Sequence, residues 1–348
     1  MIHGAARRLE RCPSCRRPRH WVKGEALVRF TMPTPTTEKL SIWCLQDGKA
    51  GHQNQVLGLA EAINRLQPAV IHKIELTGWK RGFRSIFSKS PSGLPIVRPD
   101  FIIGAGHASH VPLCVYQRRF GGRSVVLMKP TLPLQCFDIC LIPDVHRLRT
   151  VPANVVLTKG VLNRVRPGNN KNMFHGLILV GGPSSHYRWS GPEIFDQIQR
   201  VVKHSADIKW TIVTSRRTPE EFCIQAGSSN IAATIVKPDA VGSDWLPEQL
   251  AAAGTVWVSE DSVSMTYEAL TSGSQVGILE LNRHRSNRVT DCIDTLVTAN
   301  FVTRWSNWKQ RGSLVRPAER FCEAERCANE ILQRTATVNQ NDSRQRVA

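Results

Sequence analysis

Short apolar runs alternate with longer amphipathic stretches through most of this chain. The runs at 40–45, 70–76 and 101–103 have the length and composition of buried strands. In the stretch after the first run, apolar residues recur three or four positions apart, which places them on one face of a helix: Val56, Leu59, Ala60, Ile63 and Leu66. Strands that alternate with helices predict an α/β fold with parallel sheets.

The alternation occurs twice, which predicts two similar domains. The first domain covers residues 39–170 and the second residues 171–316, with a polar linker at 169–172. Each opens with a strand, a glycine-containing loop and a helix, the first unit of a doubly wound sheet. The predicted fold is therefore two Rossmann-like domains that face each other across a cleft. The first loop has no GxGxxG pattern, so we do not expect a dinucleotide there.

The two ends of the chain lie outside these two domains. Residues 1–38 are rich in arginine and predict a disordered basic extension, with Met32 as an alternative start. Cys12 and Cys15 in this extension form half of a zinc site, and because a structural zinc needs four ligands we expect no bound metal. Residues 317–334 predict a last helix, and residues 335–348 a disordered tail.

The composition is that of a soluble globular protein, with 41% hydrophobic and 21% charged residues among 348. No apolar run approaches the roughly 20 residues of a membrane-spanning helix, and the N-terminus lacks the apolar core of a secretory signal. Ten cysteines in a chain without such a signal indicate reduced thiols and a cytoplasmic location.

The net charge of +18 lies mainly in the first half of the chain. Lys and Arg exceed Asp and Glu by 5 in residues 1–38, by 12 in residues 39–170 and by only 1 in residues 171–348. This excess indicates an anionic partner: a lipid surface, a nucleic acid or a phosphorylated substrate. A nucleic acid is least favoured, because the aromatic residues of the basic half mostly lie in apolar contexts.

A basic amphipathic segment favours the lipid surface. Trp79 and Phe87 share a helical face, while Lys80, Arg81 and Arg84 lie around it. Such a segment suits peripheral binding to an anionic membrane, here at its inner, cytoplasmic face. The alternative is a helix packed on the sheet with solvated charges.

The stretch 255–281 has the pattern of a strand, a polar turn, a helix and another strand. Asp261, Ser262 and Ser264 stand at the start of the helix, whose unpaired N–H groups and partial positive charge suit a phosphate. Glu268, further along this helix, suits the two hydroxyls of a ribose, since a carboxylate accepts two hydrogen bonds at once. The alternative is a well-capped surface helix.

Two other loops of the second domain carry residues that suit a phosphate. They are Ser215, Arg216 and Arg217 after one strand, and Gly181, Gly182 and Ser184 after another. An exposed capping turn would have a similar sequence, so the alternative of a purely structural role stays open.

In the first domain, polar residues gather in the loop after the first strand. Asp47, Lys49, His52 and Asn54 together exceed what an ordinary turn requires. Because the carboxyl ends of parallel strands meet at one edge of a sheet, the next glycine turn is expected at the same cleft. That turn contributes Gly104, Gly106 and His107.

Two similar α/β halves around a cleft describe the B-type glycosyltransferase architecture. Three motifs, DGKAGHQNQ from Asp47, TSRRTP from Thr214 and SEDSVSMTYEAL from Ser259, resemble the family named for elongated mitochondria, a fission-factor family in plants with many bacterial members. The resemblance covers about residues 40–333.

A more distant likeness is to the transferases that add N-acetylglucosamine to the undecaprenyl-linked peptidoglycan precursor. GKAGH resembles their GTGGH loop, IIGAGHASHVP and LILVGGPSSH resemble two further glycine loops, and SVSMTYEAL resembles their donor-binding helix with its ribose-binding glutamate. Asp47 and Lys49 replace the first two loop glycines here, so the identity of the acceptor does not transfer.

These resemblances imply glycosyl transfer from a nucleotide sugar without a metal ion or other cofactor. The second domain would hold the donor, with Glu268 on its ribose, and the first domain would hold the acceptor. His52 or Asp47 would deprotonate the acceptor hydroxyl, since that step needs a base with a pKa near neutrality. The residues expected on the acceptor side are Lys49, Asn54, Gly104, Gly106 and His107.

Other interpretations stay open at this point. His52 has the alternative role of capping the helix that follows it. A nucleotide-sugar 2-epimerase uses the same architecture without an acceptor. An adaptor that recruits a dynamin-like GTPase to a membrane would keep the fold without catalysis. The sequence does not decide the sugar, the acceptor, whether that acceptor is lipid-linked, or the oligomeric state.

Overall fold

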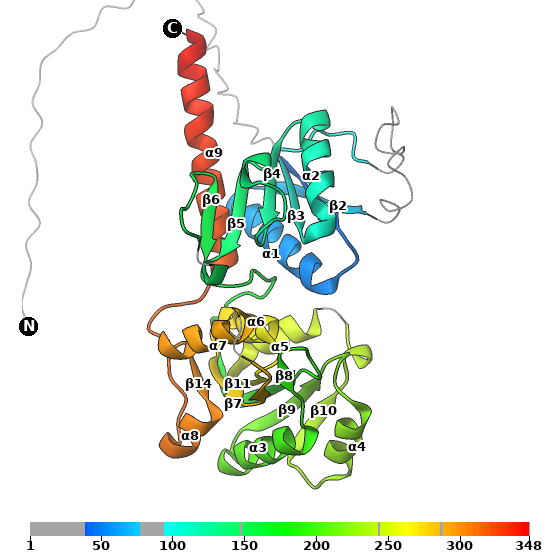
Figure 1. Ribbon diagram of the computed structural model, residues 1–348. Coiled ribbons are helices and arrows are strands. Elements are labelled where there is room, and N and C mark those ends of the chain that lie inside the picture. Colours follow the sequence, from blue (N-terminus) through cyan, green and yellow to red (C-terminus); the bar gives the residue numbers. More distant parts are fainter. Residues whose placement is uncertain (1–38, 77–93, 147, 243, 286–287, 348) are drawn as a thin grey trace, which may run out of the picture. The chain divides into compact units, whose positions relative to one another are not determined.

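The computed structural model describes residues 39–76, 94–146, 148–242, 244–285 and 288–347 (Figure 1). The predicted basic extension, 1–38, lies outside the described residues. The predicted membrane segment does so too, with Trp79, Lys80, Arg81, Arg84 and Phe87. Both predictions therefore stay untested by the structure.

The first domain contains a sheet of six parallel strands in the order β2-β1-β3-β4-β5-β6. The strands are β1 (Leu40–Gln46), β2 (Ala69–Glu75), β3 (Phe101–Ala105), β4 (Arg123–Leu127), β5 (Ile139–Pro143) and β6 (Val155–Thr158). The helices are α1 (Ala50–Leu66) and α2 (His107–Phe120), with short 3₁₀ turns η1 (Leu134–Cys136) and η2 (Asp144–His146). This flavodoxin-like order places the topological switch point between β1 and β3.

The second domain has the strand order of a Rossmann fold, β10-β9-β7-β11-β12-β14, again all parallel. Its strands are β7 (Asn172–Val180), β9 (Lys209–Thr214), β10 (Ala233–Val236), β11 (Ala253–Ser259), β12 (Gln275–Leu279) and β14 (Val302–Arg304), and β8 (Tyr187–Arg188) pairs with β13 (Asn282–Arg283). Its helices are α3 (Gly191–His204), α4 (Glu220–Ser228), η3 (Pro238–Ala240), α5 (Trp245–Ala252), α6 (Val263–Ser272), α7 (Arg288–Thr298) and α8 (Trp305–Arg311). Here the switch point lies between β7 and β11.

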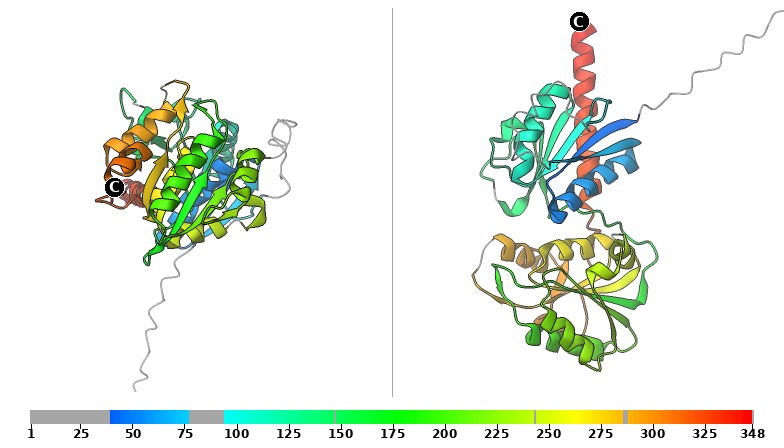
Figure 2. Two further views of the ribbon diagram at one scale, coloured as in Figure 1. Left: turned by 90° about the horizontal axis from the view of Figure 1, so that it is seen from below. Right: turned by 90° about the vertical axis from the view of Figure 1, so that its right-hand side faces the viewer.

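Both sheets are buried on two faces, which explains why their strands are continuous apolar runs. In β1, Ile42 packs toward α1, whereas Trp43 packs on the opposite face with α2. In β11, Val256 packs with α5 and α6, whereas Trp257 packs with α3 and α8. Figure 2 shows these helices on the two faces of each sheet. The predicted α/β fold of two Rossmann-like domains is confirmed.

The last helix, α9 (Glu323–Val347), corrects two predicted boundaries. It begins six residues after the predicted start at Pro317, and it continues beyond 334 into the range predicted as a disordered tail. Neither glycine nor proline occurs between 323 and 347, so nothing local ends the helix. Its first turns return to the first domain, where Ala324, Ala328 and Ile331 join the core of α1 and β1.

The connection from β6 to β7, residues 159–171, touches elements that are distant in the sequence. The amide of Asn163 lies 3.0 Å from the hydroxyl of Thr271 in α6. Arg164 forms an ion pair of 2.8 Å with Glu61 in α1. The predicted linker at 169–172 ends one residue later than the connection does, because Asn172 already belongs to β7.

Candidate functional site

A carboxylate–imidazole pair lies at the switch point of the first sheet. His52 Nδ1 lies 2.6 Å from Oδ2 of Asp47, and the other oxygen of Asp47 accepts the Lys49 N–H at 3.1 Å. The side chain of Asp47 is 2% exposed and that of His52 is 21% exposed. Gly48 makes the turn between them with a φ of +82°, which favours glycine. A ring that donates from Nδ1 to the carboxylate presents Nε2 as a hydrogen-bond acceptor.

The loop after β3 reaches the same place. The His52 ring lies so close to Gly106 that a Cβ on this glycine would overlap with it, and Gly106 has a φ of +79°. The structure thus brings His52, from the loop after β1, together with Gly106, from the loop after β3. Gly104 has a different role, because its missing side chain lets Ser109 of α2 pack directly on β3.

His107 belongs to a separate cluster of polar groups. Its Nδ1 lies 2.9 Å from the Thr131 hydroxyl, and Nδ1 of His110 lies 3.1 Å from the same oxygen. His107 is exposed, whereas His110 is buried, and burial lowers the pKa of His110. The hydroxyl has one hydrogen, so at least one imidazole must donate to it. Thr131 follows β4 and was not predicted.

Glu268 of α6 meets Asn54 of α1, although 214 residues separate them. The Asn54 amide donates to Oε1 of Glu268 at 2.7 Å. Burial raises the pKa of Glu268 to about 7, and the hydrogen bond from Asn54 lowers it. Both side chains line a cavity of about 440 Å³. Its walls include Gly51 and Leu57 of α1, Val161 and Val165 of the connection, Leu246 and Leu250 of α5, and Ser264 and Met265 of α6.

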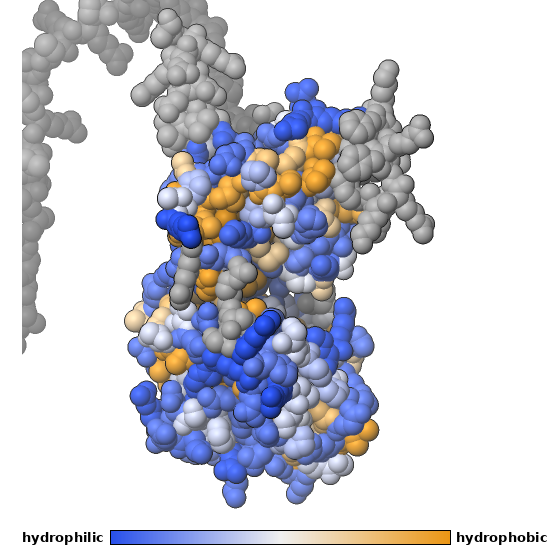
Figure 3. Space-filling model, in the orientation of Figure 1, coloured by the Kyte–Doolittle hydropathy of each residue, from blue (hydrophilic) through white to orange (hydrophobic). Residues whose placement is uncertain are grey.

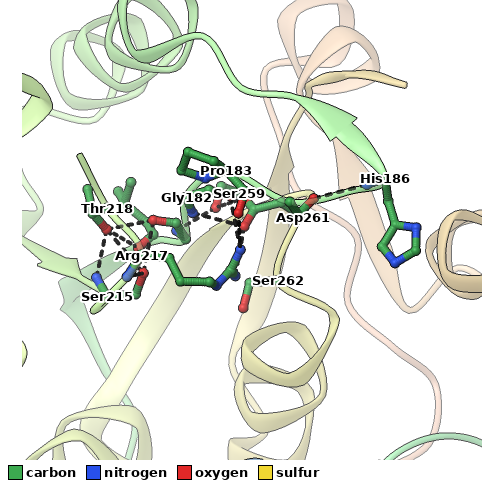
Figure 4. A network of polar contacts seen from close by, with 12 residues as sticks. Gly182, Pro183, His186, Ser215, Arg217, Thr218, Ser259, Asp261 and Ser262 are labelled. Carbon is green, nitrogen blue, oxygen red and sulfur yellow. Dashed lines mark hydrogen bonds and ion pairs between the residues drawn. The ribbon is translucent and has the colours of Figure 1, made fainter. Parts of the chain in front are cut away.

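At the switch point of the second sheet, the predicted phosphate-binding residues bind one another (Figure 4). The buried carboxylate of Asp261 accepts hydrogen bonds from the Gly182 N–H at 2.9 Å, Arg217 Nη2 at 2.9 Å and Ser259 Oγ at 2.7 Å. Burial raises the pKa of Asp261, and these contacts lower it. Arg217 also donates to the carbonyls of Gly182 at 3.0 Å and Pro183 at 3.1 Å. The polar groups of this network are thus paired with one another within the protein.

Hydroxyl groups support the same loops. Ser215 Oγ and Thr218 Oγ1 lie 2.9 and 2.6 Å from the carbonyl oxygen of Gly181. Ser184 Oγ accepts the His186 N–H at 3.4 Å. Ser259 and Thr218 were not among the predicted site residues, although Ser259 ends β11 and Thr218 lies in the loop after β9, both at the predicted edge. Arg216 is exposed, and it has no hydrogen bond or ion pair with another described residue.

Glu260 anchors the end of β11 on the side opposite Asp261. Its buried carboxylate accepts hydrogen bonds from Arg283 and Arg304, each at 2.8 Å. Asp294 pairs with the same two guanidinium groups, and the hydrogen bonds from Arg283 and then Arg304 hold its pKa at about 2. Two consecutive carboxylates therefore fix the strand end from both sides. Ser262, which follows them, is the N-cap of α6 and makes no side-chain capping bond.

No group of three or more His, Cys, Asp or Glu in the described parts of the chain is placed to hold a metal ion. Across the same residues, no helix has the length and apolar character that crossing a membrane requires. The expectation that function needs no metal stays a prediction.

Two doubly wound domains, each with polar loops at its switch point, define a protein of the B-type glycosyltransferase fold. The chain belongs to the mitochondrial fission ELM1 family, whose model matches residues 50–335. The family resemblance inferred from the three motifs is thereby confirmed. No curated protein matches the sequence closely enough to count as a relative.

Solved structures share the fold at low sequence identity. A putative UDP-N-acetylglucosamine 2-epimerase from Listeria monocytogenes is 13% identical, with a TM-score of 0.55 over 87% of this chain and 97% of that one. MurG from Acinetobacter baumannii is 12% identical, with a TM-score of 0.47 over 85% of this chain and 99% of that one. At such identities the likeness concerns the fold alone.

Proposed function

We propose that this protein transfers a glycosyl group from a nucleotide sugar without a metal ion. The observation that carries the proposal is the Asp47–His52 pair at the β1/β3 switch point, where α/β proteins present groups to a ligand. His52 is the general base, because its Nε2 can take the proton of an acceptor hydroxyl while Nδ1 is held. Asp47 is a positioning residue that orients the ring.

The reaction follows from this geometry and the known chemistry of such donors. His52 removes the hydroxyl proton as the acceptor oxygen forms a bond to the anomeric carbon of the sugar. The bond from that carbon to the diphosphate oxygen breaks, and the nucleoside diphosphate leaves with the electron pair. The partial positive charge at the start of α6, near Ser262 and Ser264, favours this anion in place of a divalent cation.

The donor nucleoside is proposed to lie beside Glu268. This residue lies four positions beyond Ser264, which corresponds to a rise of about 6 Å along the helix. A carboxylate has two oxygens, and only Oε1 of Glu268 contacts Asn54, so the other oxygen can accept a ribose hydroxyl. Phosphates are unfavourable inside the cavity itself, since Arg164, a cation in its lining, is paired with Glu61.

A membrane-associated acceptor on the first domain is a further part of the proposal. The excess of 12 positive charges in residues 39–170 supports an anionic partner. On the face drawn in Figure 3, hydrophobic residues gather over the first domain, whereas the second is mostly hydrophilic. Val111 of α2 is exposed, and Leu132, Leu134 and Leu148 are only partly buried. Apolar and basic groups together suit a lipid-linked acceptor or an anionic lipid surface.

An adaptor role is the second candidate, because the family to which the chain belongs is named for mitochondrial fission. Such a protein would keep the fold and recruit a partner, a dynamin-like GTPase, without turnover. The cleft residues would then tolerate substitution, and the basic first domain would matter most.

The test compares the unmodified chain with His52→Gln and with a matched control, His204→Gln, which replaces an exposed residue at the end of α3. Transfer or hydrolysis is measured for a panel of UDP-, GDP- and ADP-sugars, beside melting curves with UDP, GDP and ADP. Loss of a general base lowers turnover by about 10²–10⁴-fold while nucleotide stabilisation persists. The control keeps its activity. Epimerisation of a donor without an acceptor would indicate an epimerase. The absence of both turnover and nucleotide binding would favour the adaptor.

A further inference from the structure

The glycine loop of the second domain offers its N–H groups to the protein instead of a ligand. In phosphate-binding loops at a switch point, backbone N–H groups point at the anion. Here the Gly181 N–H donates to Ser259 Oγ at 2.7 Å, and the Gly182 N–H donates to Asp261 at 2.9 Å. Both donors are therefore used within the protein.

The space that the two glycines leave is also filled. A Cβ on Gly181 would overlap with the carboxylate of Asp261, and a Cβ on Gly182 would overlap with the backbone of Arg217. These glycines thus permit close packing of protein groups on the loop. They leave no opening there for a phosphate group.

The charge at this point is balanced as well. Arg217 donates to Asp261 and to two loop carbonyls, as Figure 4 shows for the labelled residues. A phosphate brought to the loop would meet a buried carboxylate of like charge, and it would have to take the guanidinium from three acceptors. Removing the partner of a buried charge is strongly unfavourable.

On the basis of the proposed function, we propose that the carboxylate of Asp261 is an internal anion that occupies the glycine loop. The donor phosphates therefore contact Arg216 and not Arg217. Arg216 follows β9, the neighbour of β7 at the same edge of the sheet. It is exposed and has no polar partner among the described residues, so a phosphate can contact it without breaking an internal hydrogen bond or ion pair. Arg217 is a positioning residue that holds the loop on Asp261.

The two arginines give a matched pair of variants. UDP binding is measured by calorimetry on the full chain, with Arg216→Gln and Arg217→Gln, and each melting temperature is recorded. Arg216→Gln is expected to weaken UDP binding about tenfold or more, the loss of a charge-assisted contact, at an unchanged melting temperature. Arg217→Gln lowers the melting temperature, because Asp261 loses its cation, and weakens UDP binding less.

A third variant tests the internal anion without any nucleotide. Asp261→Asn keeps the size of the side chain, so the loop stays filled, but it removes the negative charge. Pyrophosphate at Arg216, beside the loop, should then bind several-fold more tightly than to the unmodified chain, because the repulsion from the buried carboxylate is gone. Asp261→Ser repeats the test if the first variant melts too low to measure. Equal or weaker pyrophosphate binding by both variants overturns the proposal. So does UDP binding that depends on Arg217 more than on Arg216 at an unchanged melting temperature.

The two proposals fail in different ways. If the unmodified chain binds none of UDP, GDP and ADP, the nucleotide-sugar function fails, and pyrophosphate binding by Asp261→Asn still decides whether Asp261 occupies the loop. If a nucleotide binds but the two arginines show the opposite order, the assignment of Arg216 fails and the function stands.

Discussion

Replacing Glu268 by glutamine should stabilise the protein at alkaline pH and change little at acidic pH. The side chain lies at the cavity beside Asn54, and burial raises its pKa from 4.5 to about 7. Because the folded-state pKa is the higher one, the favourable contribution is complete below about pH 4.5 and is lost as the pH rises through about 7. Above that pH, the folded protein carries a negative charge on this half-buried side chain.

The magnitude follows from the two pKa values. Each pH unit between them corresponds to about 1.4 kcal/mol, so the upper limit is about 3 kcal/mol at pH 9. Glutamine has the same size, carries no charge, and still offers an oxygen to the Asn54 amide. Since the cavity gives Glu268 some contact with water, we expect a gain of about 1–3 kcal/mol, or a few degrees in melting temperature.

The assay is thermal unfolding of the unmodified chain and of Glu268→Gln at pH 5, 7 and 9. Glu221→Gln serves as the control, because this glutamate is exposed on α4, outside the cavity lining. The difference between Glu268→Gln and the unmodified chain should be near zero at pH 5 and should increase with pH. A difference that is independent of pH, or a variant that is less stable at pH 9, would refute the reasoning about the buried charge.

Three further outcomes are expected. Gly106→Ala should abolish turnover, because its Cβ would displace the His52 ring. Gly121→Ala is the control: Gly121 has a φ of +77° but open space around it, so alanine there should cost about 1–3 kcal/mol of similar backbone strain and keep activity. A chain that begins at Met32 should melt at the same temperature as the full chain, and a drop of several degrees would show that the extension packs on the fold. Binding to anionic vesicles should be nearly lost when three cations are replaced, since each contributes about 1 kcal/mol, and salt-insensitive binding would contradict this. These cations are Lys80, Arg81 and Arg84.

Local periodicity was sufficient to predict most elements near the candidate site. The apolar run at 40–45 became β1, the helical spacing from Val56 became α1, and the turn at 259–264 led from β11 into α6. These predictions succeed because a strand buried on both faces and a helix with one buried face leave different repeats in the sequence. The gathering of polar loops at strand ends also followed, since it is a general property of parallel sheets.

The partner of each polar side chain was decided by the tertiary structure. Nothing local connects Asn54 with Glu268, and the motif TSRRTP does not distinguish an arginine held by Asp261 from its exposed neighbour. The boundary of α9 was equally hidden, because its first turns are stabilised by a core that begins at β1, near the other end of the described chain. Hydrogen bonds and ion pairs depend on distances of a few ångströms between groups that only the strand order brings together, so the sequence could name the charged residues but not their neighbours.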